Sequence, residues 1–295
     1  MKTRLAGLLF LLSVVLNSCE KNVSFKLHDE EQKLVVEATI ENGQVPTVVL
    51  SNSLDYFSAI SPEILEKSFV HDADVSISNG TLTHKLKEYT YSQNGYNFYY
   101  YSVDSSSLAT AFAGQLNTSY SLKINVAGNE YNAVTTIPKI TKVIDSVFTR
   151  RASEFLPDSL QALVITATDP PGYGDYVRYY TKDNSEPFYP GINSVFDDQI
   201  IDGTTYTLQV DRGYPRNLGL TEDNLIYFNK GDTVTFKLCN IDKATFDFWR
   251  TMEFAYASVG NPFSSPTKVL SNIGGNGLGY FAGYAAQYRT IVIPK

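Results

Sequence analysis

Much of the chain alternates between apolar and polar positions with a period of two residues, a pattern typical of β-strands with one buried face. The alternation is clearest in the segments KLVVEATIEN, ADVSISNGTLTHKL and DTVTFKLCN, which begin at residues 33, 73 and 232. In the second segment an Asn79-Gly80 dipeptide separates two apolar runs, which predicts a tight hairpin. The pattern therefore predicts a mainly β protein.

The spacing of the predicted strands indicates two β-sandwich domains. About seven short strands fall within residues 33–138, which suits an immunoglobulin-like or transthyretin-like sandwich. Pro138 follows the last of these strands, and proline cannot continue a strand inside a sheet. Residues 139–295 then begin a second β domain. Within it, the aromatic and proline-bearing segment 183–204 is expected to be a long irregular loop.

One segment of the second domain departs from the β pattern. Residues 240–259 contain no glycine or proline, and Asp242 is a good candidate for a helix N-cap. We expect a helix near 242–258, inserted in the β domain and apolar over a wide arc, so that it packs on a sheet. Trp249, the only tryptophan, is interpreted as a core residue of this helix, with ligand stacking as the alternative.

The beginning of the chain has the features of a bacterial lipoprotein signal peptide. Two basic residues precede the apolar run Leu5–Leu16, which is shorter than the roughly 20 residues that a membrane-spanning helix needs. The run ends at Ser18-Cys19, and this ending resembles a lipobox, in which cleavage precedes a diacylglyceryl-modified cysteine. We expect residues 1–18 to be removed, Cys19 to carry the lipid, and residues 19–32 to form a polar tether. An ordinary signal peptide with a chance cysteine is the alternative.

Charge and cysteine content narrow the partners. The chain has 24 basic and 31 acidic residues, a formal charge of −7, which becomes −9 when Lys2 and Arg4 leave with the signal peptide. This balance argues against nucleic acid as a partner, since nucleic-acid binding requires a basic surface. Attachment to the membrane would therefore come from the lipid on Cys19. The remaining cysteine, Cys239, is expected to be an unreactive core residue.

A search for catalytic motifs yields no enzyme and no cofactor. The three histidines do not form a His-Glu-x-x-His frame, and no Gly-x-Ser-x-Gly motif is present. Residues 277–282 fit a relaxed dinucleotide-binding fingerprint, but the required acidic residue about 20 positions further on is missing. Asp197, Asp198 and Asp202 remain open between a Ca²⁺ site and caps of local turns.

Aromatic residues offer candidate contact surfaces. Tyrosine accounts for 21 residues, many of them within residues 89–102, where alternation places rings on both faces of a strand. Those rings belong either to cross-strand packing or to an interface. In the predicted loop 183–204, Phe188, Tyr189 and Phe196 are the best candidates for anchors that bind a protein partner.

Four blocks carry a family resemblance: KLVVEATIENGQVPTVVLSNSLDYF, ATDPPGYGDYVRYY, SVFDDQIIDGTTYTL and NPFSSPTKVLSNIGGNGLGYFAGYAAQYRTIVIP. Together they resemble the Bacteroidota lipoproteins grouped as domain of unknown function 4249. Genes of this family often neighbour those of outer-membrane TonB-dependent receptors, which implies an accessory role at a transporter.

We therefore expect a non-enzymatic lipoprotein of the outer membrane that serves as an accessory or binding subunit, most simply for a TonB-dependent receptor. A surface module that binds glycans or peptides for nutrient capture is the alternative. Acidic residues after a lipidated cysteine, here Glu20 and the run Asp29-Glu30-Glu31, can direct Bacteroidota lipoproteins to the cell surface. Surface exposure is accordingly favoured over the periplasmic face. The ligand is not indicated by the sequence.

Overall fold

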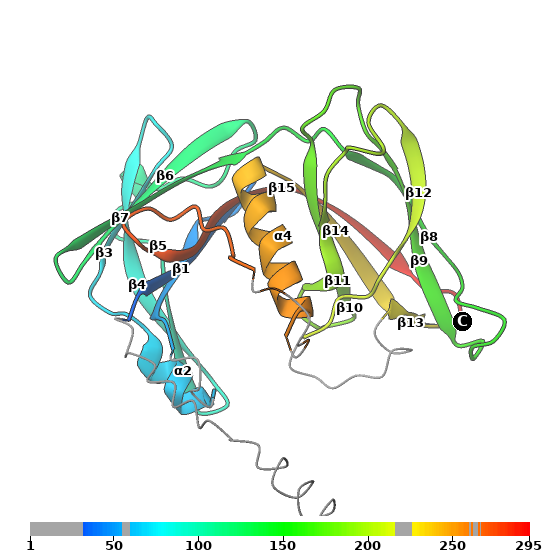
Figure 1. Ribbon diagram of the computed structural model, residues 1–295, viewed down its shortest axis with the longest axis horizontal. Helices are drawn as coiled ribbons and strands as arrows, with labels where there is room; N and C mark the ends of the chain where they lie inside the picture. The colour runs from blue at the N-terminus through cyan, green and yellow to red at the C-terminus, as the bar shows by residue number, and fades with distance from the viewer. Residues whose placement is uncertain (1–31, 55–59, 216–225, 260, 262–264, 266) are drawn as a thin grey trace, which may run out of the picture. The chain divides into compact units, whose positions relative to one another are not determined.

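A computed structural model of the protein describes residues 32–54, 60–215, 226–259, 261, 265 and 267–295 (Figure 1). The predictions for the signal peptide, for Ser18 and Cys19, and for the tether up to residue 31 fall outside the described residues. The described part is mainly β, as the alternation of the sequence predicts.

The strands fall into two groups along the chain. The first group contains β1 (Leu34–Glu41), β2 (Thr47–Asn52), β3 (Asp74–Ser78), β4 (Thr83–Gln93), β5 (Tyr96–Val103), β6 (Thr118–Val126) and β7 (Asn129–Ile137). The second contains β8 (Val143–Arg151), β9 (Leu160–Thr168), β10 (Tyr176–Asp183), β11 (Tyr189–Phe196), β12 (Thr205–Val210), β13 (Phe228–Asn229), β14 (Thr233–Ile241) and β15 (Leu278–Val292). Among the described residues, the helices include α2 (Pro62–Ser68), the short 3₁₀ helix η1 (Leu108–Thr110) and α4 (Lys243–Ala257).

The long strand β15 joins the two groups. In the described part of the chain, the larger sheet has the order β11-β10-β14-β15-β1-β2-β5-β4-β3-β6-β7. The first half of β15 runs parallel to β1, from Leu278 opposite Val35 to Tyr284 opposite Glu41. Its second half pairs antiparallel with β14. The division into two domains at residue 138 stays a prediction, and β15 is a strand that both groups share.

The first core lies between β15, β1 and the strands that follow β1. Val36, Ala38 and Ile40 of β1 are buried in it, as the alternation predicts, and Phe281 of β15 joins them. Strand β7 packs directly on β15, and a Cβ atom at Gly283 would lie 2.6 Å from the backbone of Thr136. A glycine is therefore required at this position for the two backbones to approach.

The second core lies between β10, β14 and β15 on one side and a smaller sheet on the other. The smaller sheet has the order β12-β9-β13, with β8 paired to β9. Val234, Phe236 and Leu238 of β14 point into this core. Alternate residues of the same strand, including Cys239, point to the opposite face, which α4 covers (Figure 1).

Asp242 fixes the start of α4 over this face. One carboxylate oxygen of the N-cap residue Asp242 accepts a hydrogen bond from the backbone N–H of Thr245 at 2.8 Å, which satisfies a free donor of the first helical turn. The other oxygen accepts bonds from the Thr135 hydroxyl and the Thr136 N–H of β7, at 2.9 and 2.8 Å. A single side chain thus holds the helix, within the expected range 242–258, against β7.

The long irregular loop expected at residues 183–204 is wrong. Strand β11 occupies Tyr189–Phe196 and pairs antiparallel with β10. It is the terminal strand of the larger sheet, and proline is tolerated on edge strands because one row of their N–H groups has no partner strand. The proline-bearing character of this segment, with Pro190 inside it, therefore suggested a loop where an edge strand forms.

Candidate functional site: an aromatic pocket under helix α4

A pocket of about 480 Å³ lies between α4 and the face of the larger sheet beneath it. Strands β1, β10, β14 and β15 form its floor, and α4 and the start of β11 form its walls. Its lining residues are Thr39, Glu41, Arg178, Tyr180, Phe188, Pro190, Lys237, Trp249, Met252, Glu253, Tyr256, Tyr280 and Tyr284. The lining is thus rich in aromatic rings and contains two cations and two carboxylates.

The register of the strands explains why this face is hollow. Cys239 of β14 lies directly opposite Arg178 of β10 on one side and Ala286 of β15 on the other. Cys239 and Ala286 are small and buried, so the floor is low there. Two residues earlier on β14, Lys237 lies between Tyr180 and Tyr288. Large aromatic side chains therefore lie beside small side chains on the same face of the sheet. The space above the small side chains is left as a cavity.

Arg178 is the most unusual residue of the pocket because its charge is buried. Only 3% of its surface is exposed. The guanidinium carbon lies 3.4 Å from the centre of the Trp249 ring and 4.9 Å from that of Tyr180, and Nε donates to the Ser194 hydroxyl at 3.2 Å. No carboxylate of the described residues lies within 4.0 Å of the guanidinium.

The nearest acidic group on the helix is engaged elsewhere. Both carboxylate oxygens of Glu253 accept the backbone N–H of Ser194 at 3.1 Å, and one of them also accepts the Ser194 hydroxyl proton. Ser194 thereby stands between Glu253 and Arg178, accepting from the arginine and donating to the glutamate. This chain of contacts ties α4 to β11 and orients the guanidinium.

Lys237, the second cation of the pocket, has its positive charge balanced by the carboxylate of Glu41. Its ammonium forms an ion pair with Glu41 of β1 and lies 5.3–6.0 Å from the centres of four aromatic rings, those of Tyr180, Phe188, Tyr284 and Tyr288. Burial opposes the charge, but Glu41 and the surrounding groups hold the pKa of Lys237 above its ordinary value. Lys237 is therefore a positively charged structural centre of the aromatic group.

Two phenols of the pocket, those of Tyr180 and Tyr280, are hydrogen-bond donors rather than anions. Burial raises the pKa of Tyr180 and that of Tyr280 well above the ordinary value, so both hydroxyls stay protonated. The Tyr284 hydroxyl accepts a hydrogen bond from Trp249 Nε1 at 3.1 Å. The pocket thus presents neutral donors beside a buried cation.

Trp249 packs against the core cluster under α4, as interpreted from the sequence, and it also separates two cavities. It is partly buried, and with Met252 and Tyr280 it lines both the 480 Å³ pocket and a neighbouring cavity of about 370 Å³ over β1 and the start of β15. Arg178 covers one ring face, and the rings of Phe248 and Tyr280 lie with their centres 4.9 and 4.7 Å away. Trp249 therefore forms a wall of the pocket.

The three residues predicted as anchors for a protein partner do not share one surface. Phe188 lines the aromatic pocket, with its ring centre 5.8 Å from that of Tyr288. Phe196 lies on the other face of the sheet, stacked on Tyr179 at 6.1 Å, where it lines a separate cavity of about 320 Å³. Tyr189 is half-buried between them on β11. Phe188 precedes β11, and the pairing of β11 with β10 shifts register between Arg178 and Tyr180, so the two phenylalanines do not share a face.

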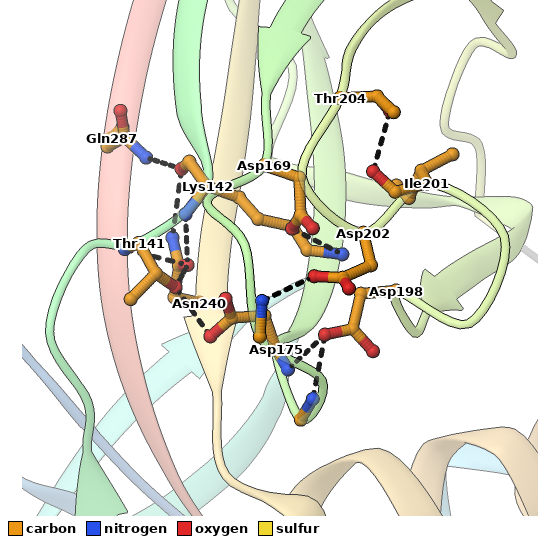
Figure 2. Close-up of polar contacts among 12 residues, drawn as sticks. Thr141, Lys142, Asp169, Asp175, Asp198, Ile201, Asp202, Thr204, Asn240 and Gln287 are labelled. Atoms are coloured by element: carbon orange, nitrogen blue, oxygen red, sulfur yellow. Dashed lines mark hydrogen bonds and ion pairs between the residues drawn. The ribbon is translucent and has the colours of Figure 1, made fainter.

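Two of the three acidic residues singled out near position 200, Asp198 and Asp202, cap turns. Asp198 accepts hydrogen bonds from the backbone N–H groups of Gly174 and Asp175 at 2.7 and 2.9 Å, and Asp202 accepts one from Gly172 at 2.6 Å (Figure 2). These bonds hold the loop 169–175 against the loop 197–204. Asp197 lies apart from them and lines the 320 Å³ cavity. The capping role is therefore the one that the geometry displays.

A buried lysine, Lys142, lies beside a cluster of three carboxylates, those of Asp169, Asp175 and Asp198. Asp169, Asp175 and Asp198 each place a carboxylate oxygen within 4.8 Å of the others, an arrangement of oxygen ligands that suits a hard cation. Figure 2 shows the Lys142 side chain reaching into the group, with its ammonium 3.2 Å from Asp169. Both side chains of this pair are fully buried. Lys142 thus provides the positive charge that such a cluster requires.

The pKa directions agree with this arrangement. Burial raises the pKa of Asp169, although Lys142 opposes the shift. For Asp198 burial acts in the same direction, but the hydrogen bonds from Asp175 and Gly174 outweigh it and lower the pKa. Asp198 is consequently ionised in the folded protein well below neutral pH.

Two further sequence interpretations can be compared with the structure. Cys239 is fully buried, which confirms a core residue, and burial raises the pKa of its thiol to about 12, which disfavours the reactive thiolate. In the tyrosine-rich segment, Tyr91 lies opposite Phe98 and Tyr89 opposite Tyr100, with ring centres 5.2 and 5.7 Å apart. These rings make cross-strand pairs, which is one of the two roles left open.

The polar members of the pocket were not among the residues that the sequence singled out. Arg178, Lys237 and Glu41 occupy alternate positions of strands, and such positions normally face solvent. The available signal was Asp242, which marks the start of a helix, because a helix that packs on a sheet must cover one of its two faces. It did not show which face.

No described residue belongs to a helix with the length and apolar character needed to cross a membrane.

Comparison with known proteins gives one positive result. A search of curated proteins found no match. The sequence model of the family described as Domain of unknown function (DUF4249) matches residues 20–290. Because this match covers nearly the whole sequence, the chain belongs to the DUF4249 family.

Proposed function

We propose that this protein is a lipid-anchored, non-enzymatic binding protein of the outer membrane, and that its ligand occupies the aromatic pocket under α4. The pocket carries the proposal. Its volume of about 480 Å³ lies in the range typical of small-molecule sites, which combine mostly apolar walls with a few polar groups. Both groups of strands contribute to the pocket, so the complete fold is required to form it.

Binding is favoured over catalysis because the pocket acids serve the protein's own contacts. Glu41 interacts with Lys237 and accepts a hydrogen bond from the Tyr288 hydroxyl. Glu253 is taken up by Ser194. Carboxylates held in this way position the walls and do not present a free general acid or base to a bound molecule.

An accessory role at a receptor accounts for a second feature of α4. Met252, Phe254 and Tyr256 are 38%, 57% and 49% exposed, and Met252 and Tyr256 also line the pocket. Exposed apolar side chains next to a ligand pocket suit contact with a protein partner. We propose that this partner is a TonB-dependent receptor of a Bacteroidota outer membrane, on the cell-surface side.

A glycan is a less suitable ligand than an amphipathic small molecule. Sugar rings stack on freely accessible aromatic faces, and Trp249 offers little such surface, because Arg178, Phe248 and Tyr280 all lie against its ring. The glycan alternative would need a different platform in the protein.

The proposal is tested by filling the pocket. Met252→Trp adds volume at an exposed helical position that lines the pocket, and Phe254→Trp makes a comparable change at an exposed position of α4 that is absent from the pocket lining. Both variants and the wild type would be purified from native membranes in mild detergent, and the retained small molecules identified by mass spectrometry. We expect a compound that the wild type and Phe254→Trp retain and Met252→Trp lacks. Identical contents in all three proteins would contradict the proposal.

Anchoring is tested separately at Cys19. Cys19→Ala should leave the precursor uncleaved at this site and absent from outer-membrane fractions, because no sulfur is available for the diacylglyceryl group. Membrane fractionation with immunoblotting measures both effects. Retention of the variant in the outer membrane at the wild-type level would contradict lipid anchoring.

A further inference from the structure

We infer that the occupant of the aromatic pocket is an amphipathic carboxylate, whose carboxyl group pairs with Arg178 and whose apolar body lies against the helix α4 wall. This inference rests on the proposed binding function and narrows it to one chemical class of ligand.

Arg178 is a buried cation that has no carboxylate of the described residues beside it. Buried cations are normally paired with an acidic group, because removing an unpaired charge from water is costly. Arg178 is 3% exposed, and its only hydrogen bond to a described side chain is the one from Nε to Ser194. Elsewhere in the described protein, the buried Lys142 has Asp169 at 3.2 Å. Arg178 faces a cavity where the corresponding carboxylate would stand.

The orientation of the Arg178 guanidinium also suits a carboxylate. Its flat face lies over Trp249, with 3.4 Å between the guanidinium carbon and the ring centre. Stacking uses the face of the group and leaves the N–H bonds directed outward in its plane. A planar fork of donors fixed in this way matches the two oxygens of a carboxylate. Ser194 and Glu253 hold the orientation from the other side.

The charged and polar groups around Arg178 are held by contacts within the protein. Lys237 and Glu41 neutralise each other, and Glu253 is bonded to Ser194. The phenols of Tyr180 and Tyr280 are protonated and line the same pocket. An entering anion therefore meets the buried cation of Arg178 and neutral donors, while the negative charge of Glu253, which also acts on Arg178, is separated from the guanidinium by Ser194.

The apolar walls of the pocket indicate what the rest of the ligand is. Phe188, Pro190 and Met252 supply apolar walls. A small inorganic anion would leave these walls exposed to water, whereas an aliphatic or aromatic acid would cover them. The combination of one buried cation with apolar walls thus favours an amphipathic acid over a bare anion.

The test uses Trp249 as a built-in reporter, since it is the only tryptophan and touches Arg178. Intrinsic fluorescence titration and calorimetry would compare 4-phenylbutyrate with its neutral isostere 4-phenylbutyramide. A second pair, the peptide Gly-Gly-Phe with a free or an amidated C-terminus, distinguishes a small acid from a peptide end. We expect one acid of these pairs to bind about ten- to a hundred-fold more tightly than its amide, as a charge-assisted hydrogen bond predicts.

Three variants assign the effect to Arg178. Arg178→Met removes the guanidinium and should reduce acid binding to the level of the amide. Arg250→Met is the matched control, because Arg250 is an exposed arginine near Trp249 on α4 that lines the separate 320 Å³ cavity. Met252→Glu places a carboxylate at an exposed position beside the pocket, so it should abolish acid binding even if Arg178→Met does not fold. Thermal unfolding followed by circular dichroism confirms the folded state of each variant.

The outcomes separate the two proposals. Equal binding of acids and amides, or unchanged acid binding in a folded Arg178→Met or Met252→Glu, overturns the carboxylate inference and leaves the binding function standing. If no probe binds the wild type, the carboxylate inference is also overturned, and the native-membrane experiment on Met252→Trp then decides the binding function alone.

Discussion

The protein buries two cations in different settings. Lys142 is fully buried and lies 3.2 Å from Asp169 within a group of carboxylates. Arg178 is almost as deeply buried, yet no carboxylate of the described residues approaches it within 4.0 Å, and it lines a 480 Å³ pocket. A buried charge that is paired with an opposite charge within the fold serves stability, whereas one that faces a cavity is available to a ligand. The contrast between Lys142 and Arg178 distinguishes a structural site from a binding site.

The largest effect is expected when the structural cation is removed. Lys142→Met leaves Asp169 buried without its counter-ion, and breaking a buried pair in this way costs about 3–5 kcal/mol. Chemical denaturation of the body of the protein would measure the loss in the free energy of unfolding. The double variant Lys142→Met with Asp169→Leu should regain most of it, because the unpaired carboxylate is gone. A single variant as stable as the wild type would show that the pair is not structural.

A smaller loss is expected for the other cation. Arg178→Met removes the stacking on Trp249, worth up to about 2 kcal/mol when desolvated, and the hydrogen bond to Ser194, but it also removes the cost of burying a cation that has no adjacent carboxylate. The variant should therefore unfold with a free energy at most about 2 kcal/mol below the wild type, clearly less than Lys142→Met loses. The same denaturation experiment compares the two. Equal losses would remove the distinction between the structural and the binding cation.

The smallest effect should depend on pH. The folded pKa of Asp198 is lowered, so its carboxylate contributes stability above the unfolded pKa of about 3.9, and this contribution is lost as the pH falls through the lower folded pKa. Asp198→Asn should cost about 1–2 kcal/mol near pH 7, and the difference from the wild type should shrink as the pH approaches 3. Unfolding curves at several pH values measure it. A cost independent of pH would argue for packing instead.

Local features of the sequence predicted the elements better than their partners. Alternation in β14 correctly placed Val234, Phe236 and Leu238 on one face and Cys239 on the other, because one-sided burial imposes a period of two. Asp242 marked the start of α4 through its capping chemistry. Pro190 obscured β11, since the tolerance of an edge strand for proline depends on its place in the sheet.

The candidate site depends on pairings that the sequence does not express. Arg178 and Lys237 are polar residues at alternate strand positions, which is also the pattern of a solvent-facing row. They become pocket residues only because β10, β14 and β15 align Cys239 between Arg178 and Ala286, and because α4 covers that face. Such register is set by tertiary contacts far apart in the chain.

The dual pairing of β15 also governs when the protein can fold. Its first half supplies the parallel neighbour of β1, and Phe281 fills the first core, while its second half pairs with β14, and Ile293, just beyond the strand, fills the second core. Closing a loop between the first and last strands of a chain is slow and entropically costly. During synthesis, β1 must therefore wait for nearly the whole polypeptide before its sheet is complete. A chain that stops before residue 278 would expose both cores, so partially made copies would be targets for proteolysis.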